Sequence, residues 1–141
     1  MLVYRLERPM QIGAVLRNIG PWIAACYDPS LEDVTWRYKR KLPGSCPEPR
    51  EDGITGFVEN SDQVCGWYNE EGIFNWCRWK DDTEALEAVG FKINQYEVPD
   101  NRILLGKTQC VWSELDATLI KSVSWQEMVD AITSKEESYS E

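Results

Sequence analysis

The side chains available for chemistry in this 141-residue chain are carboxylates, tyrosines, lysines, arginines and cysteines, because the sequence contains no histidine. The lack of histidine excludes Ser-His-Asp and Cys-His nucleophile pairs, and any histidine general base. No two carboxylates have a spacing that assigns acid and base roles to them, and no Gly-rich phosphate loop is present. The sequence therefore predicts no catalytic residue, and it leaves open whether the protein is an enzyme.

The five cysteines include no CxxC pair, so a zinc site would need an all-cysteine arrangement. An odd number of cysteines in a chain without a secretory signal is typical of reduced, buried thiols in a cytosolic protein. No run of about 18 apolar residues is present, so we expect no membrane span. These observations predict a cytoplasmic protein without a metal site.

One basic cluster, RYKRK, stands out at residues 37–41. It is a candidate anion or phosphate site, with Trp36 and Tyr38 available for stacking. The alternative is that these charges lie at the C-terminal end of a helix, where the helix dipole favours them. The candidate anion site consists of Arg37, Lys39, Arg40 and Lys41.

Net charge is distributed unevenly along the chain. Residues 1–50 carry eight Lys and Arg against five Asp and Glu, whereas residues 51–141 carry seven against nineteen, giving balances of +3 and −12 that sum to −9. Such acidity argues against direct nucleic-acid binding, which needs clustered Lys and Arg. It fits either simple solvation or an acidic surface that engages a basic groove on another protein. The candidate acidic surface consists of Glu70, Glu71, Asp81, Asp82, Glu84 and Glu87.

The first third of the chain is predicted from periodicity and turn residues. Alternating apolar residues predict a strand over Leu2–Leu6, which Pro9 ends. Apolar residues at i, i+3, i+4 and i+7 predict a short amphipathic helix or turn over Ile12–Ile19. A second short helix is expected over Leu31–Tyr38, with Ser30 as its N-cap.

The stretch Cys65–Val98 is expected to organise the rest of the chain. Two strands, Ile54–Val58 and Gln63–Trp67, are predicted to form a hairpin that leads into it, and Gly66 indicates a bulge or a close backbone approach. Asn69 is expected to cap the first of two helices. Gly90 is expected to end the second helix in a left-handed conformation.

The remaining elements are mostly strands. A strand is predicted over Phe91–Val98, with a bulge near Asn94-Gln95. Ser124–Glu127 forms a capping box that opens a final amphipathic helix. Further strands are expected at Arg102–Leu105 and Thr108–Trp112. The pattern over Ala117–Val123 fits either a strand or a helix, and we favour a strand.

This order of elements predicts an α+β protein. We expect a single domain over residues 1–134, with a polar C-terminal tail at residues 135–141. The domain is expected to contain a twisted, mostly antiparallel sheet of about six or seven strands with two to four short helices. The oligomeric state is not predicted.

Four segments carry a resemblance to small proteins of bacteriophages and prophages: VYRLE near the start, CGWYNEEGIFNWC in the middle, GFKINQYEVP, and GKTQCVW. The resemblance implies a phage protein in the cytoplasm of a bacterial host. Most of the residues in these segments are typical of structural positions such as strands, turns and helix caps, rather than of a functional site.

A more distant similarity is to the ADP-ribosyltransferase fold, which has a basic residue on its first strand and a catalytic glutamate on a late strand. The similarity implies that Arg5 holds part of NAD, that the Trp67–Asn69 turn flanks the nicotinamide, and that Gln109 occupies the place of the glutamate. Glutamine cannot supply that carboxylate, and the turn lacks the family's Ser-Thr-Ser. The implied ligand cleft consists of Tyr4, Arg5, Trp67, Asn69 and Gln109.

Two functions follow as hypotheses. The first is a non-enzymatic phage protein that binds a host protein through its acidic surface, for example as an inhibitor of a nucleic-acid-handling defence complex. The alternative is an ADP-ribosyltransferase-like domain that binds NAD or another nucleotide, with altered or lost activity. No cofactor is assigned under the first hypothesis, whereas NAD is the cofactor implied by the second.

Overall fold

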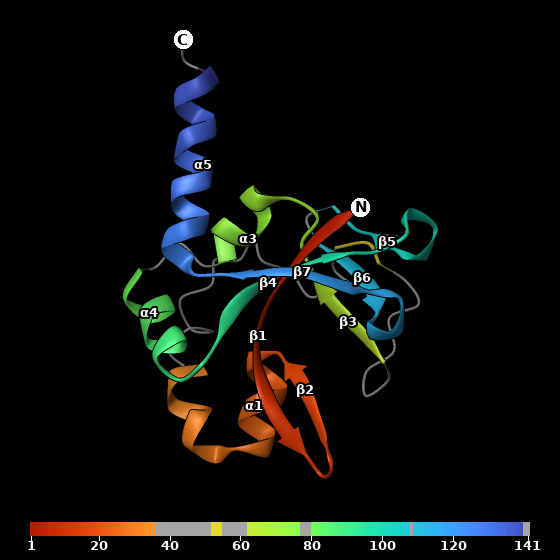
Figure 1. Ribbon diagram of the computed structural model, residues 1–141, viewed down its shortest axis with the longest axis vertical. Helices are drawn as coiled ribbons and strands as arrows, with labels where there is room; N and C mark the ends of the chain where they lie inside the picture. Colours follow the sequence, from red (N-terminus) through yellow and green to blue (C-terminus); the bar gives the residue numbers. More distant parts are fainter. Residues whose placement is uncertain (36–51, 55–61, 77–79, 108, 140–141) are drawn as a thin grey trace.

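The computed structural model describes residues 1–35, 52–54, 62–76, 80–107 and 109–139 (Figure 1). Seven strands are found in this part of the chain: β1 (Leu2–Ile12), β2 (Val15–Ile19), β3 (Gln63–Gly66), β4 (Lys92–Glu97), β5 (Leu104–Leu105), β6 (Cys110–Ser113) and β7 (Thr118–Val123). The α-helices are α1 (Pro21–Tyr27), α3 (Glu70–Trp76), α4 (Lys80–Ala88) and α5 (Trp125–Tyr139). Short 3-10 helices are η1 (Pro29–Leu31), η2 (Asp100–Arg102) and η3 (Glu114–Asp116).

The strands form two antiparallel sheets. The first has the order β2-β1-β4-β7 and the second has the order β3-β6-β5. Hydrogen bonds between the backbones of Tyr4 and Trp67, at 2.8 and 2.9 Å, link the two sheets. The α+β class is confirmed, and its strands are divided between two sheets, where a single sheet was expected.

The first sheet is covered on both faces. Successive side chains of a strand point to opposite sides, so β1 contributes to a core on each face. Tyr4 and Leu6 of β1 enter an apolar core that also contains Ile73 of α3, Leu86 of α4 and buried residues of α5. Val3 points the other way, into a second core shared with Val64, Val98, Cys110 and Trp112 of the sheet-to-sheet interface. The helices therefore cover one face of the first sheet, and the second sheet covers the other.

Of the helix or turn expected over Ile12–Ile19, a turn is found at residues 13–14, and the helix is wrong because Val15–Ile19 form the return strand of the β1–β2 hairpin. Gly13 has a φ of 61°, which allows the chain to reverse between Ile12 and Val15. The expected end of the first strand at Pro9 is also wrong. Pro9 is tolerated because β4 pairs only with Leu2–Glu7, so proline's missing N–H falls beyond that ladder.

The helical segment after α1 begins differently from the prediction. Asp28, rather than Ser30, accepts a hydrogen bond from the Ser30 backbone N–H at 3.1 Å and caps η1. Residues 32–35 are helical, and the rest of the predicted Leu31–Tyr38 helix lies outside the described residues, as does most of the predicted strand Ile54–Val58.

The caps expected at Asn69 and Ser124 and the bulge expected in β4 are confirmed, whereas Arg102 of the expected strand Arg102–Leu105 lies in η2. Asn69 Oδ1 accepts from the Gly72 N–H at 2.7 Å, and Ser124 Oγ accepts from the Glu127 N–H at 3.2 Å, so both caps form. A register shift in the β4–β7 ladder falls between Gln95 and Tyr96, where the bulge was expected. Helix α5 continues through residues 135–139 of the expected tail and projects from the body of the protein (Figure 1).

Candidate functional site

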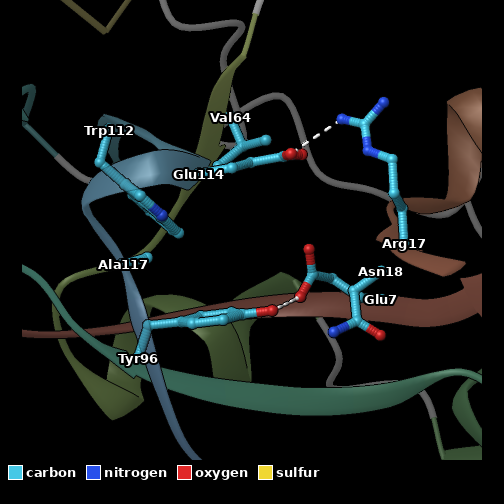
Figure 2. A pocket seen from close by; sticks show the side chains of 8 residues that line it. All are labelled: Glu7, Arg17, Asn18, Val64, Tyr96, Trp112, Glu114 and Ala117. Atoms are coloured by element: carbon cyan, nitrogen blue, oxygen red, sulfur yellow. Dashed lines mark hydrogen bonds and ion pairs between the residues drawn. The ribbon is translucent and has the colours of Figure 1, made fainter. Parts of the chain in front are cut away.

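A pocket of about 190 Å³ lies between the two sheets (Figure 2). Its polar lining consists of Glu7 on β1, Arg17 and Asn18 on β2, and Glu114 on η3. Tyr96 and Trp112 provide aromatic walls, with Val64 and Ala117 beside them. The hairpin that replaces the expected helix is what carries Arg17 and Asn18 to this place.

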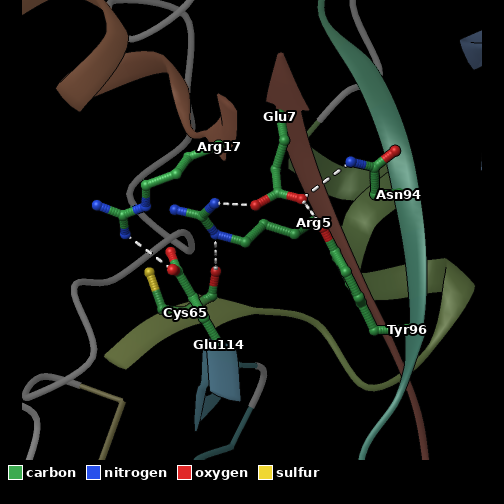
Figure 3. A network of polar contacts seen from close by, with 7 residues as sticks. All are labelled: Arg5, Glu7, Arg17, Cys65, Asn94, Tyr96 and Glu114. Atoms are coloured by element: carbon green, nitrogen blue, oxygen red, sulfur yellow. Dashed lines mark hydrogen bonds and ion pairs between the residues drawn. The ribbon is translucent and has the colours of Figure 1, made fainter. Parts of the chain in front are cut away.

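Glu7 is the centre of a buried polar network on the face of β1 that meets the second sheet (Figure 3). Its side chain is buried, and its carboxylate forms an ion pair with Arg5. The same carboxylate accepts hydrogen bonds from Asn94 Nδ2, at 2.9 Å, and from the Tyr96 hydroxyl. These partners offset the free-energy cost of burying the charge, since an isolated buried carboxylate would be strongly destabilising.

The network continues to both sides of Glu7. Arg5 Nε donates to the Cys65 carbonyl oxygen at 3.1 Å, which ties β1 to the first strand of the second sheet. Ser122 Oγ donates to Asn94 Oδ1 at 2.6 Å and brings β7 into the network. Four strands therefore contribute polar groups around one carboxylate.

Burial raises the pKa of the Tyr96 hydroxyl, and the neighbouring Glu7 charge raises it further. Hydrogen bonding by Asn94 and Asn18 acts in the opposite direction on the pKa of Tyr96. Tyr96 is therefore a neutral donor to Glu7 at ordinary pH. Burial likewise raises the pKa of the Cys110 thiol to about 12, so this cysteine is not a nucleophile near neutrality.

The rim of the pocket is formed by an ion pair between Arg17 Nη2 and Glu114 Oε2, at 2.8 Å (Figure 2). Both side chains are partly exposed, at 40% and 31%. Below this pair, the ring centroids of Tyr96 and Trp112 are 6.4 Å apart and the ring planes are inclined by 50°. The pocket thus has a charged but internally neutral rim over aromatic walls.

The predicted ligand-cleft residues do not line this pocket. Tyr4 and Trp67 are brought together by their backbone hydrogen bonds, and both are buried. Arg5 points to the opposite face of β1 from Tyr4, toward Glu7. Asn69 is engaged as the cap of α3, and the buried Gln109 is held through its backbone N–H by Asp52 Oδ2 at 2.8 Å.

Two side chains of the predicted acidic surface, Glu70 and Glu87, form hydrogen bonds within the protein. Glu70 accepts from the Tyr4 hydroxyl at 3.5 Å, and Glu87 accepts from the Trp125 N–H at the start of α5. Glu71 and Glu84 are exposed. The side chains of Asp81 and Asp82 lie outside the described residues, as does the whole predicted anion site of Arg37, Lys39, Arg40 and Lys41.

Sequence reasoning missed Glu7, Asn94 and Tyr96. A signal for Glu7 was close at hand. The predicted strand Leu2–Leu6 ended one residue before it, and a strand that continues past Leu6 places Glu7 on the same face as Arg5. Their distant partners gave no comparable signal. Within the described ranges, no group of three or more Cys, Asp or Glu side chains is arranged to hold a metal ion. No helix in the described part of the chain is both long and apolar enough to cross a membrane.

Comparison with protein families identifies the class of protein: this two-sheet α+β chain is a bacteriophage protein. It belongs to the family described as the bacteriophage T4 Y00F protein, whose model matches residues 1–126. The match covers both sheets and ends at the beginning of α5. Neither a curated protein nor a solved structure matches the chain.

Proposed function

We propose that this phage protein acts by binding a protein of its bacterial host through the acidic outer side of helices α3, α4 and α5. The observation that carries the proposal is the charge of these helices. Every ionisable side chain that the structure describes on them is acidic, and α5 packs against both α3 and α4. The exposed members are Glu71, Glu84, Glu127 and Asp130.

The partner chemistry that fits this surface is a basic groove. The balance of −12 over residues 51–141 would steer association with such a groove and would repel nucleic acid. A basic groove that normally holds nucleic acid is the natural match, so the specific form of the proposal is an inhibitor of a nucleic-acid-handling defence complex in the host cytoplasm.

A binding role is also favoured by the state of Glu7, a carboxylate buried between the two sheets. Glu7 already has Arg5, Asn94 and Tyr96 as partners, so it is held as a structural charge rather than presented to a substrate. No observation favours the alternative of an ADP-ribosyltransferase-like NAD site.

The test uses the full chain as bait in a lysate of the bacterial host, followed by identification of the captured protein and measurement of its affinity. We expect capture at low salt, release at high salt, and displacement by DNA, because DNA would compete for the same basic groove. The double variant Glu84→Lys/Asp130→Lys should weaken binding by about tenfold or more.

The matched control is Glu32→Lys/Glu97→Lys, which changes the net charge equally at exposed positions outside these helices. The control should keep nearly full affinity. Equal losses in the two double variants would reduce the interaction to nonspecific charge attraction. Unchanged affinity of the helix variant, or no captured protein at low salt, would overturn the proposal.

A further inference from the structure

The pocket between the sheets is not used by the proposed host-binding surface, and its lining defines a ligand of a particular kind. Its charges are already balanced, since Glu7 is paired with Arg5, and Glu114 with Arg17. A charged ligand would bring an uncompensated charge next to the buried Glu7–Arg5 pair, which costs free energy. A neutral ligand avoids this cost.

The walls select a flat ligand. Tyr96 is partly exposed whereas Trp112 is only 2% exposed, so Tyr96 offers the aromatic surface on which a planar ring can stack. Because the centroids of these two side chains are 6.4 Å apart and their planes are inclined by 50°, they form no parallel slot, so a ring would stack on one wall only. The volume of about 190 Å³ is below that of pockets for larger ligands, and it suits a single ring system.

The polar end of the pocket selects a ligand edge with both donors and acceptors. The Asn18 carboxamide lies beside the Glu7 carboxylate and the Tyr96 hydroxyl (Figure 2). It is hydrogen-bonded to Tyr96, which leaves its acceptor oxygen and one N–H donor for a ligand. Asparagine pairs in this way with the edge of a nucleobase. The Arg17–Glu114 pair at the rim supplies a further donor and a further acceptor.

We infer that this pocket binds one uncharged, planar nitrogen heterocycle of the nucleobase class, as a free base or a nucleoside. The ring stacks on Tyr96, and Asn18 contacts its polar edge. A nucleotide is a poor ligand, because its phosphate would add negative charge beside Glu7 and Glu114 in a chain of net charge −9.

The inference is tested by titrating the full chain with adenosine, cytidine and uridine, and with their 5′-monophosphates, by calorimetry and NMR. We expect at least one nucleoside to bind with a Kd near or below about 1 mM, and its monophosphate to bind about tenfold more weakly. Ala117→Leu fills the pocket and should abolish binding. Thr118→Leu, at the exposed neighbouring position, should not change it.

Asn18→Ala is a second variant that keeps the pocket open, and it should weaken nucleoside binding by about fivefold or more through the lost hydrogen bonds. Absence of binding by all three nucleosides would overturn the inference. It would also be overturned by monophosphates that bind as tightly as the nucleosides, or by binding that survives in both Ala117→Leu and Asn18→Ala.

Discussion

The buried Glu7 carboxylate is held by one partner that is close in the sequence and by two that are distant. Its ion pair with Arg5 follows from strand alternation alone, because residues two apart on a strand share a face. Its hydrogen bonds to Asn94 and Tyr96 join residues 87 and 89 positions apart, and nothing local marks them. Of this network only Arg5 was a candidate site residue from the sequence, whereas Glu7 and the cluster around it were not predicted.

The same residue offers a test of how the buried charges are held. The Arg5 side chain is only 14% exposed. In Glu7→Gln, Arg5 would therefore remain largely buried after losing its counter-charge. We expect a loss of about 3 kcal/mol in the free energy of unfolding, measured by urea denaturation. Glu32→Gln, at an exposed position, should change stability by less than about 0.5 kcal/mol. A loss in Glu7→Gln no larger than in this control would show that the network does not stabilise the fold.

At the scale of elements, the caps of α3 and α5 were predictable and the β1–β2 hairpin was not. A cap depends on a few consecutive residues, so Asn69 and Ser124 could be recognised from their neighbours. The spacing of apolar residues over Ile12–Ile19 matches a helical face by coincidence. In the structure Ile12 and Val15 are cross-strand partners, and Val15 and Leu16 are both exposed, so no helical face is buried.

The C-terminal end of α4 agrees with the sequence prediction that Gly90 ends this helix in a left-handed conformation. The Gly90 N–H bonds to the Glu87 carbonyl oxygen at 2.9 Å, and the Phe91 N–H bonds to the Leu86 carbonyl oxygen at 3.1 Å, which is a Schellman motif. Gly90 has a φ of 102°, and a side chain there would approach Arg8 Nε at 3.3 Å.

We therefore expect Gly90→Val to lower the free energy of unfolding by about 2 kcal/mol or more, because a β-branched residue is strained at this φ. The measurement is urea denaturation followed by tryptophan fluorescence. Ala88→Val, at an exposed position in the last turn of the same helix, should cost less than about 1 kcal/mol. Stability of Gly90→Val within about 0.5 kcal/mol of wild type would contradict the assigned role of Gly90.

At the scale of the whole molecule, the strand types were predictable and the division into two sheets was not. The order β2-β1-β4-β7 joins the first two strands of the chain to strands that follow α4 and η3. Such long-range pairing leaves no mark in local periodicity. One residue did indicate the junction, since Gly66 was expected to mark a bulge or a close backbone approach.

The structure shows the close approach: Gly66 lies where β3 meets both β1 and Trp112. A Cβ at this position would overlap the Tyr4 carbonyl oxygen and would lie 2.5 Å from the Trp112 ring, and both neighbours are buried. Because backbone cannot yield as a flexible side chain does, Gly66→Ala must push the two sheets apart. We expect it to lower the free energy of unfolding by more than about 2 kcal/mol in urea denaturation.

The comparison variant for this junction is Gly53→Ala, which has a positive φ of 92° but no atom within 4 Å of the added Cβ. It isolates the cost of backbone strain, about 1 kcal/mol, from the cost of steric overlap. The excess loss in Gly66→Ala measures how firmly the Tyr4–Trp67 bridge holds the sheets together, and with them the pocket that lies between them. If Gly66→Ala lost no more stability than Gly53→Ala, the two sheets would have to adjust to each other more freely than their packing implies.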